Sequence, residues 1–347
     1  MDRILLAHGS GGRLSHDLVR DLFLSQFPAP ELAKLDDAAV MHPLAETKTG
    51  SRPEVSASGR IALTTDSHVV KPLFFSGGDI GRLAVCGTVN DLAMVGSIPL
   101  YLSAGFVIEE GLEMDVLRRV VASMRASADE AGVEIVAGDT KVVEKGEADQ
   151  LFITTAGVGI VPEGVDISAS NARPGDVVIL SGAIGDHGIA VISEREGLAF
   201  KTQLASDMAP LNYLVAAMQK ASPEIHVMRD PTRGGLATAL NEIALQSGVA
   251  IAIEEGRVPV HEGVRAACEM LGYDPLYVAN EGKLLAIVDA QAAPGVLAVM
   301  REDPHGQESA IIGEVKTQPE GRVLLNTDIG GTRIVDMLAG EMLPRIC

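Results

Sequence analysis

Aspartate closes three short apolar runs in this chain: IALTTD (61–66), EIVAGD (134–139) and IHVMRD (225–230). Each run predicts a strand that passes into a loop at its Asp, and ligands of open α/β sheets bind at the carboxyl ends of strands. The segments LDDAAV (35–40) and TVNDLA (88–93) add further polar side chains. Oxygen ligands from separate segments suit a hard cation such as Mg²⁺ that also holds phosphate. The candidates are Asp36, Asp37, Asp66, Asn90, Asp91, Asp139 and Asp230.

Three glycine-rich segments accompany these carboxylates: HGSGGR (8–13), FFSGGDIG (74–81) and DPTRGG (230–235). Backbone N–H groups of the first segment could wrap an anion. The other two each lead into a predicted helix, whose N-terminus favours phosphate. Each Asp taken alone could instead cap a helix, and each glycine cluster could be an ordinary turn. The set as a whole favours a metal–phosphate site, although neither a Walker loop nor a dinucleotide fingerprint occurs.

Two charged residues stand beside these segments. Lys141 follows Gly-Asp-Thr and could neutralise phosphate charge, and Glu281 in NEGK (280–283) could act as a base if burial raises its pKa. The alternatives are a surface lysine and a glutamate that caps a turn. His8 and His187 are interpreted as turn residues.

Composition restricts the class of protein. A chain of 347 residues exceeds the usual size of one hydrophobic core, so two domains are expected. The net charge of −19 argues against a nucleic-acid-binding surface. No signal-peptide pattern opens the chain, and glycines and a proline interrupt the uncharged run 92–108, so neither a leader nor a membrane span is predicted.

The three cysteines, Cys86, Cys268 and Cys347, show neither CxxC spacing nor a companion His pattern. This sparse usage fits a reducing cytoplasm and predicts neither a zinc site nor a disulfide framework. Cys86 and Cys268 lie in predicted helices and are interpreted as small buried hydrophobes. Cys347 ends the chain in EMLPRIC (341–347), either as an incidental thiol or as a nucleophile on a tether.

Helical and strand patterns alternate along both halves of the chain, which indicates an α/β architecture. Helices are expected over about 117–131, 207–221, 236–246, 261–271 and 294–302. Short buried strands are expected at VEIVAG, LFITTAGVGIV, GDVVILSG, IHVM, VAIAI, LLAIV, AIIGEV and RVLL. The aperiodic segment 162–176 predicts the domain junction, and 46–60 predicts a solvated loop.

Nine motifs in order give the chain its resemblance to a known family. They are HGSGG, LDDAAV, TTDSHVV, FFSGGDIG, GTVNDLA, GDTKVVEKG, RDPTRGGLATALNE, ANEGK and the terminal PRIC. This ordered set resembles the HypE family of hydrogenase maturation factors, of the superfamily of aminoimidazole ribonucleotide synthetase, selenophosphate synthetase and thiamine-monophosphate kinase. The resemblance covers essentially the whole chain, and its terminal motif is highly specific.

The resemblance implies a homodimer of two-domain α/β subunits with a C-terminal tail. The implied parts are an N-terminal ATP-binding and dimerisation domain (1–165), a C-terminal α/β domain (166–338) and a mobile tail (339–347). It implies ATP and Mg²⁺, with metal-bound phosphates held by Asp37, Asp66, Asp91 and Asp230. The nucleotide would also contact Gly9, Ser10, Gly11, Gly12, Asn90, Asp139 and Thr140.

The family's reaction implies that the tail carries the reacting group. The partner HypF carbamoylates the terminal thiol, here Cys347, and ATP-dependent dehydration converts the S-carboxamide to an S-cyanate. The cyano group then passes to iron on the HypC–HypD complex during maturation of NiFe hydrogenase. Glu281 is the candidate base and Lys141 a phosphate or carbamoyl partner. From Leu338, an extended chain can carry the thiol about 30 Å.

Two alternatives remain open from the sequence. One is another phosphorylating enzyme of the superfamily, such as a selenophosphate synthetase, although the N-terminal HGSGGRLS lacks the Cys or selenocysteine and Lys usual there. The other is a non-catalytic ATP-binding scaffold whose tail docks partners. The set of carboxylates argues against the scaffold.

Overall fold

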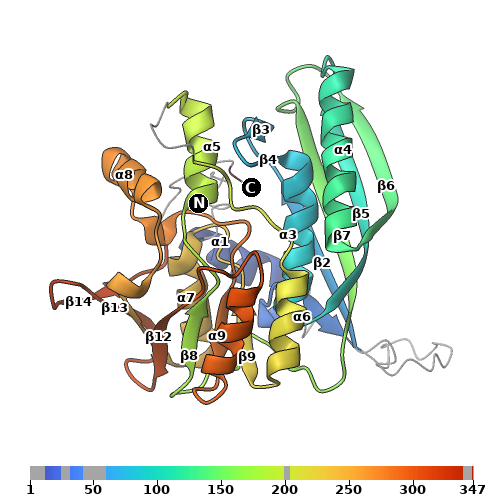
Figure 1. Ribbon diagram of the computed structural model, residues 1–347. Coiled ribbons are helices and arrows are strands. Elements are labelled where there is room, and N and C mark those ends of the chain that lie inside the picture. The colour runs from blue at the N-terminus through green and yellow to red at the C-terminus, as the bar shows by residue number, and fades with distance from the viewer. Residues whose placement is uncertain (1–11, 25–31, 42–59, 199–203, 339–345, 347) are drawn as a thin grey trace.

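The chain folds into two sheet-based domains in a computed structural model that describes residues 12–24, 32–41, 60–198, 204–338 and 346. The N-terminal domain has a five-stranded sheet in the order β1-β2-β7-β5-β6. Its helices α3 and α4 cover the same face of that sheet (Figure 1). The element bounds are β1 Ala39–Met41, β2 Arg60–His68, α3 Ile80–Met94, β5 Ile98–Glu109, α4 Met114–Ala131, β6 Glu134–Val143 and β7 Leu151–Val161.

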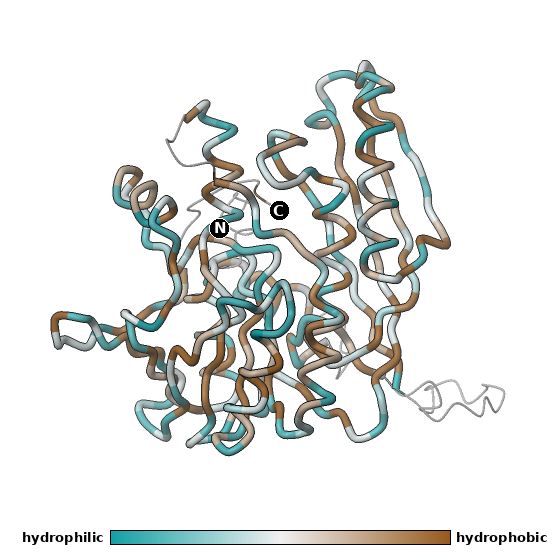
Figure 2. Tube along the Cα trace, viewed as in Figure 1, coloured by the Kyte–Doolittle hydropathy of each residue, from teal (hydrophilic) through white to brown (hydrophobic). Residues whose placement is uncertain are grey.

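The C-terminal domain is built on a seven-stranded sheet in the order β14-β13-β10-β12-β8-β11-β9. The strands are β8 Val177–Leu180, β9 Ile225–Arg229, β10 Ala250–Glu254, β11 Leu285–Val288, β12 Ala310–Lys316, β13 Arg322–Asn326 and β14 Thr332–Val335. Helix α7 (Gly235–Ser247) packs on one face, and α6 (Asn212–Ala221) and α9 (Ala293–Glu302) pack on the other. Hydrophobic residues mark the central strands between these layers (Figure 2).

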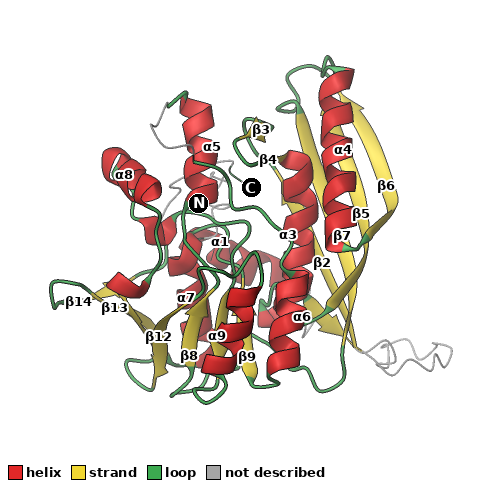
Figure 3. Cartoon of the chain, in the orientation of Figure 1, coloured by secondary structure: helices red, strands yellow, loops and turns green. Residues whose placement is uncertain are grey.

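The two domains share one hydrophobic cluster. It joins apolar side chains of α3 and α4 to those of α5 (Asp186–Glu196) and α8 (Glu262–Leu271) from the C-terminal domain. The hairpin of β3 (Phe74–Phe75) and β4 (Gly78–Asp79) contributes Phe75 to the same cluster. Figure 3 shows α5 and α8 above the strands of the C-terminal domain in this view. The shared core holds the two domains against each other.

Several short helical elements complete the described structure. Helix α1 (Arg13–Leu18) continues into the single-turn π-helix Val19–Phe23, and 3₁₀ turns span Leu32–Lys34, Glu255–Arg257 and Pro275–Tyr277. No helix in the described parts of the chain combines the length and apolar character that a membrane span requires. Apart from Arg60, the predicted loop 46–60 lies outside the described residues.

Most predicted elements are present. Helix α4 ends at Ala131 before Gly132, which caps it at φ +70°, and β7 spans the predicted LFITTAGVGIV. Cys86 and Cys268 are buried, as expected of small hydrophobes. Helix α5 and strand β14 were not predicted. The α5 sequence, DHGIAVISERE, has no N-terminal side-chain cap and only a short apolar run, so it lacks a clear helical signal.

Three local predictions are wrong. Helix α6 begins at Asn212, not Asp207, because residues 204–211 form an irregular segment, here called the strap, between the domains. Strand β6 does not end at Asp139 but continues to Val143, and it is exposed, not buried, because it forms the edge of its sheet. Strand β2 likewise continues past Asp66 to His68.

Candidate functional site

An acidic cavity of about 380 Å³ lies where the two domains meet. Its walls come from β2, α3, the loop between β9 and α7, the start of α1, and the loop before β11. Five of the predicted carboxylates line it: Asp37, Asp66, Asp91, Asp230 and Glu281. The fold therefore brings together side chains that lie more than 200 residues apart in the sequence, between Asp37 and Glu281.

Asp37 shares a buried guanidinium with Glu242 of α7. Arg229 Nη2 lies 3.4 Å from Asp37 Oδ1 and 2.7 Å from Glu242 Oε2. Burial raises the pKa of Asp37 well above its usual range, and the Arg229 charge opposes that shift only in part. His16 of α1 approaches Glu242 Oε1 at 2.7 Å. This network ties the segment that follows the N-terminal glycines to the C-terminal domain.

Asp91 and Asp230 are held close to other negative charges. Thr64 donates a hydrogen bond of 2.8 Å to Asp91 Oδ2. Burial, followed by the charges of Asp230 and Asp66, raises the pKa of Asp91 well above its usual range. Burial also raises the pKa of Asp230 to about 6, although Arg229 acts in the opposite direction. Carboxylates crowded in this way favour a bound cation, which would relieve their mutual repulsion.

The donor set fits Mg²⁺ shared with phosphate better than an all-protein metal cage. Among the described residues, no three His, Cys, Asp or Glu side chains form a group that could hold a metal by themselves. Mg²⁺ usually takes one or two carboxylates and completes its shell with water and substrate phosphates. The loop after β9 adds Arg233 to the cavity wall, and α7 begins there with the left-handed residues Gly234 and Gly235. The N-terminus of α7 suits an anion.

The N-terminus of α3 does not offer the predicted phosphate site. Asp79 caps this helix, and its Oδ1 accepts hydrogen bonds from the backbone N–H groups of Gly81 and Arg82, at 2.7 and 3.2 Å. The helix therefore carries its own carboxylate where an anion was expected. Asp36 also acts structurally, since Ser168 and the backbone N–H of Ala169 donate to it, 2.9 Å from Oδ1 in each case.

Glu281 is buried at the cavity wall, with 4% of its surface exposed. Its Oε1 has no hydrogen-bond partner among the described residues. Burial, together with the charges of Asp230, Asp66 and Asp207, raises its pKa well above the usual range. Its backbone is fixed on both sides: the N–H donates to Asp207 Oδ1 at 3.0 Å, and the carbonyl accepts from Asn90 at 3.2 Å. Glu281 is therefore a buried carboxyl group with one unpartnered oxygen and an increased affinity for a proton.

Asn90 supports the site from behind the cavity wall. Its buried amide donates to the carbonyls of Ala209 and Glu281 and accepts from the N–H of Leu211. All three contacts hold the strap 204–211 and the Glu281 loop against α3. These contacts with described residues use both N–H donors of the Asn90 amide and one of the two acceptor positions on its Oδ1.

Asp139, Thr140 and Lys141 are separated from the cavity. They lie on the edge strand β6, and Lys141 is paired with Asp139 at 2.9 Å, with both side chains 69% exposed. Within one subunit they therefore form a surface group that does not line the acidic cavity.

The remaining predicted positions lie at the two ends of the chain. Gly9, Ser10, Gly11 and Cys347 are outside the described residues. Gly12 is buried against Leu338: an added Cβ would lie 2.2 Å from the Leu338 oxygen, to which Arg13 N–H donates at 3.0 Å. The start of α1 therefore contacts the base of the C-terminal tail.

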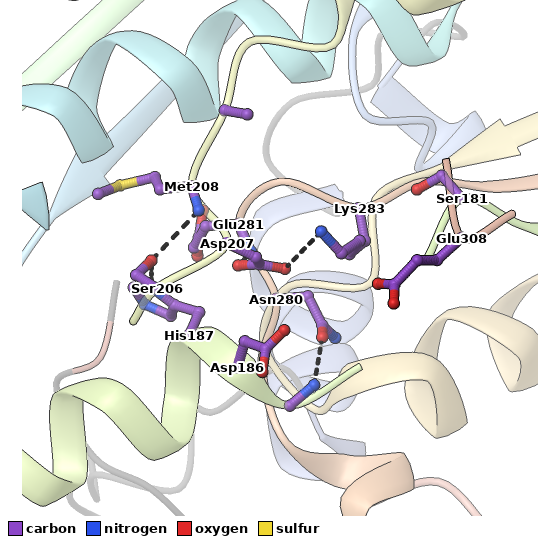
Figure 4. Close-up of polar contacts among 12 residues, drawn as sticks. Ser181, Asp186, His187, Ser206, Asp207, Met208, Asn280, Glu281, Lys283 and Glu308 are labelled. Atoms are coloured by element: carbon purple, nitrogen blue, oxygen red, sulfur yellow. Dashed lines mark hydrogen bonds and ion pairs between the residues drawn. The ribbon is translucent and has the colours of Figure 1, made fainter. Parts of the chain in front are cut away.

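His187, predicted as a turn residue, is instead fully buried near the start of α5. Its Nε2 lies 2.6 Å from the carbonyl oxygen of Ile346, the residue before Cys347. The close-up in Figure 4 shows His187 and Ser206 near Asp207, Glu281 and Lys283.

Sequence reasoning missed Arg229, His187, Ser206 and Asp207 as parts of this region. Arg229 had a signal, because a charged residue directly before Asp230 interrupts an apolar strand. The strap residues Ser206 and Asp207 had none, because the apolar pattern that follows them predicts a helix from about residue 207.

Comparisons with known proteins agree with the two-domain division. Residues 35–161 match the model of the AIR synthase related protein N-terminal domain, and residues 173–326 match its C-terminal domain. Carbamoyl dehydratase HypE of Azotobacter vinelandii is 52% identical over 342 residues, which span 99% of this chain and 96% of that protein.

Two solved structures are also similar over most of their length. A hydrogenase maturation protein HypE in complex with ATP aligns with a TM-score of 0.81 at 50% identity, covering 99% of this chain and 100% of that one. A HypE–HypF complex contains a chain that aligns with a TM-score of 0.85 at 48% identity, covering 92% of this chain and 99% of that one.

Proposed function

This chain belongs to the HypE family of carbamoyl dehydratases, and from that premise we propose that it uses ATP to dehydrate an S-carboxamide on its own Cys347 to an S-cyanate. The observation that carries this proposal is the 52% identity to a carbamoyl dehydratase over nearly the whole of both chains. The cyano group would supply a cyanide ligand to iron during maturation of NiFe hydrogenase.

The chemistry starts from a poor leaving group, the carboxamide oxygen. In the first step this oxygen attacks the γ-phosphorus of ATP, ADP leaves, and one N–H proton is lost. The product is an O-phosphoryl imidate attached to the Cys347 sulfur. Loss of the second N–H proton and departure of phosphate then form the C≡N bond. The sum is R–S–C(=O)NH₂ plus ATP giving R–S–C≡N, ADP and phosphate.

Glu281 is the proposed base for the N–H protons. Its unpartnered Oε1 and its raised pKa support this role. Asp37, Asp66, Asp91 and Asp230 are the proposed ligands of Mg²⁺ and its phosphates. When bound, Mg²⁺ would offset the negative charge of these carboxylates and of the phosphates. Arg233 and the α7 N-terminus, at the same wall, favour phosphate as well.

A homodimer would complete this site. Strand β6 is an exposed edge, and its apolar residues Ile135, Val136 and Val142 are at least 38% exposed. An exposed apolar edge strand is a template for pairing with another chain. A cavity of about 540 Å³ between α4 and β6 adds further uncovered surface. We propose that a second copy covers this face and that Lys141, with Asp139 and Thr140, serves the acidic cavity of the partner subunit.

Two partners follow from the same function. A carbamoyltransferase, HypF, would load Cys347, and a HypC–HypD complex would receive the cyano group. The similarity to the chain in a HypE–HypF complex supports the first partner. The cytoplasm is the proposed compartment, since Cys86 and Cys268 are both free thiols in this structure.

Intact mass spectrometry tests the proposal directly. The purified chain is incubated with HypF, carbamoyl phosphate and ATP, and the mass of Cys347-bearing protein is followed with time. A carbamoyl adduct that loses the mass of one water, and that is absent from Cys347→Ala, is the expected result. An adduct that forms but is never dehydrated, with ATP and Mg²⁺ in excess, would rule out the dehydratase activity.

A further inference from the structure

His187 is a buried histidine with a partner at each ring nitrogen. Its Nδ1 lies 2.8 Å from Ser206 Oγ, and its Nε2 lies 2.6 Å from the Ile346 carbonyl oxygen. Its ring and that of Phe75 form a T-shaped pair, with ring centroids 5.5 Å apart and planes at 83°. These contacts come from α5, the strap, the β3–β4 hairpin and the C-terminal end of the chain.

The partners determine which nitrogen carries the hydrogen. A carbonyl oxygen only accepts, so Nε2 donates to Ile346. Burial lowers the pKa of His187 and so favours the neutral ring. In the neutral ring Nδ1 accepts, and the Ser206 hydroxyl supplies the hydrogen. Ser206 Oγ also accepts from the backbone N–H of Met208 at 3.3 Å, which leaves its own hydrogen for His187. The ring is therefore held in one tautomer that presents an N–H to the tail.

Ile346 is held by apolar contacts as well as by this hydrogen bond. It is 5% exposed and belongs to the hydrophobic cluster shared by both domains. Burying a branched aliphatic side chain is favourable, because it removes apolar surface from water. His187 and the shared hydrophobic cluster thus form a binding position for Ile346, the residue that directly precedes the terminal cysteine. We call this position the seat.

The strap connects this seat to Glu281. Ser206 contacts His187, and the next residue, Asp207, accepts the backbone N–H of Glu281 at 3.0 Å (Figure 4). The strap packs closely against two glycines, Gly77 and Gly282, and neither position leaves room for a side chain between the glycine and the strap. A Cβ on Gly77 would lie 2.5 Å from Ser206 N, and one on Gly282 would lie 1.8 Å from the Asp207 oxygen.

We propose that His187 is a positioning residue, and that together with the apolar seat it forms a binding site for the chain's own C-terminal dipeptide. The ligand class is a peptide end with a branched aliphatic residue before its terminal cysteine. Fixing the residue next to Cys347 limits where the reacting group can lie relative to Glu281, which reduces the entropy cost of reaching the transition state. The catalytic consequence rests on the proposed dehydration, whereas the binding site does not.

Alkylation of Cys347 with iodoacetamide tests the seat without any catalysis. The reaction is selective, because burial raises the pKa of Cys86 to about 12 and that of Cys268 to about 11. Seating Ile346 should slow the alkylation of its neighbour. His187→Phe and Ile346→Ala should each speed alkylation about fivefold, the loss expected for one hydrogen bond or its equivalent.

Conservative variants separate the hydrogen bond from packing. His187→Gln keeps an N–H donor and should retain most of the protection, as should Ile346→Val. His226→Gln, at a buried histidine paired with Asp176, is the control for general loosening and should leave the rate unchanged. Melting temperatures identify any variant that has lost its fold.

Equal acceleration of alkylation in His187→Phe and His187→Gln would overturn the hydrogen-bond role. A wild-type alkylation rate in all four His187 and Ile346 variants would overturn the seat. In a second arm, carbamoylated wild type, His187→Phe and His187→Gln are mixed with saturating ATP. Slower cyanate formation in His187→Phe, rescued in His187→Gln, supports the positioning role, and equal rates contradict it. Failure of dehydration in the wild type would contradict the proposed function and leave the alkylation result standing.

Discussion

At the scale of a single residue, the charged Asp230 carboxylate destabilises the folded protein when no cation is bound, although it is a proposed ligand of that cation. Its pKa is raised from 3.8 to about 6, chiefly by burial. The folded state therefore binds a proton more tightly than the unfolded state, and this contribution to stability is lost as the pH rises from about 4 to 6. Above that range the charged carboxylate destabilises the fold until a cation arrives.

Replacing Asp230 with Asn should consequently stabilise the protein without nucleotide at neutral pH. The gain is at most about 3 kcal/mol, the equivalent of a shift of about two pKa units. The same change should remove most of the stabilisation that ATP and Mg²⁺ give. Thermal unfolding with and without the nucleotide measures both effects. Asp115→Asn, at a side chain 83% exposed, is the control and should change neither. A less stable Asp230→Asn protein at pH 7.5 would contradict the argument.

Glu281 should impose a pH dependence on dehydration. Burial and neighbouring carboxylates raise its pKa well above 4.5, so the basic form is lost as the pH falls through the raised value. We expect the single-turnover rate of cyanate formation to rise with pH over a range above that of an ordinary glutamate. Glu281→Gln should lower the rate at least a hundredfold, the usual contribution of a general base. Nucleotide binding should persist, and full cyanation by this variant would eliminate Glu281 as the base.

The chemical character of the cavity could be predicted from residue types alone, but the roles of individual residues could not. Carboxylates after apolar runs correctly indicated Asp66 and Asp230 as neighbours, but the same pattern included Asp139, which lies on the exposed edge strand β6. The segments LDDAAV and TVNDLA added Asp91, which lines the cavity, and Asp36, whose partners Ser168 and Ala169 are distant in sequence. The prediction also omitted Arg229, whose importance comes from sitting between Asp37 and Glu242. Such pairings depend on tertiary contacts that no local pattern records.

At the scale of elements, the strap 204–211 holds the Glu281 loop, because Asp207 accepts the backbone N–H of Glu281. Gly282 lies under it, with the Asp207 carbonyl oxygen 1.8 Å from where a Cβ would be. Gly282→Ala should displace the strap from Glu281, destabilise the fold by about 1–3 kcal/mol and slow dehydration. Gly295→Ala, in α9 with no atom within 4 Å of the added Cβ, is the matched control. It should be neutral or stabilising. Equal effects of the two changes on cyanate formation would show that the strap does not position Glu281.

Periodicity predicted the regular elements well and the strap badly. Strands such as β7, and helices such as α4 and α7, carry their own signals in apolar spacing and glycine stops. Residues 208–211 are apolar and buried, so this irregular segment resembles the start of a helix in its sequence. Strand β6 shows the converse error. Its apolar residues indicated burial, but within one subunit they are exposed.

At the scale of the whole molecule, that exposed strand separates two parts of the predicted site. Glu281 lines the acidic cavity, whereas Lys141 lies on the edge of the N-terminal sheet. A single subunit therefore does not unite the proposed base with the proposed phosphate partner. If both act in one reaction, a second copy must supply Lys141, and the sites of a dimer would each combine residues of two chains.

Mixed dimers of Lys141→Ala and Glu281→Gln chains distinguish these cases. In a mixed dimer, the Lys141→Ala chain keeps its own Glu281 and receives Lys141 from its partner, so one site is intact. The other site lacks both groups. Each homodimer should be nearly inactive, and random reassociation of equal amounts should restore about one quarter of the wild-type sites. Intact mass identifies the chain that reacts: the S-cyanate should appear on the Lys141→Ala chain and be absent from the Glu281→Gln chain. If mixing restores nothing although mixed dimers form, Lys141 acts within its own subunit or not at all.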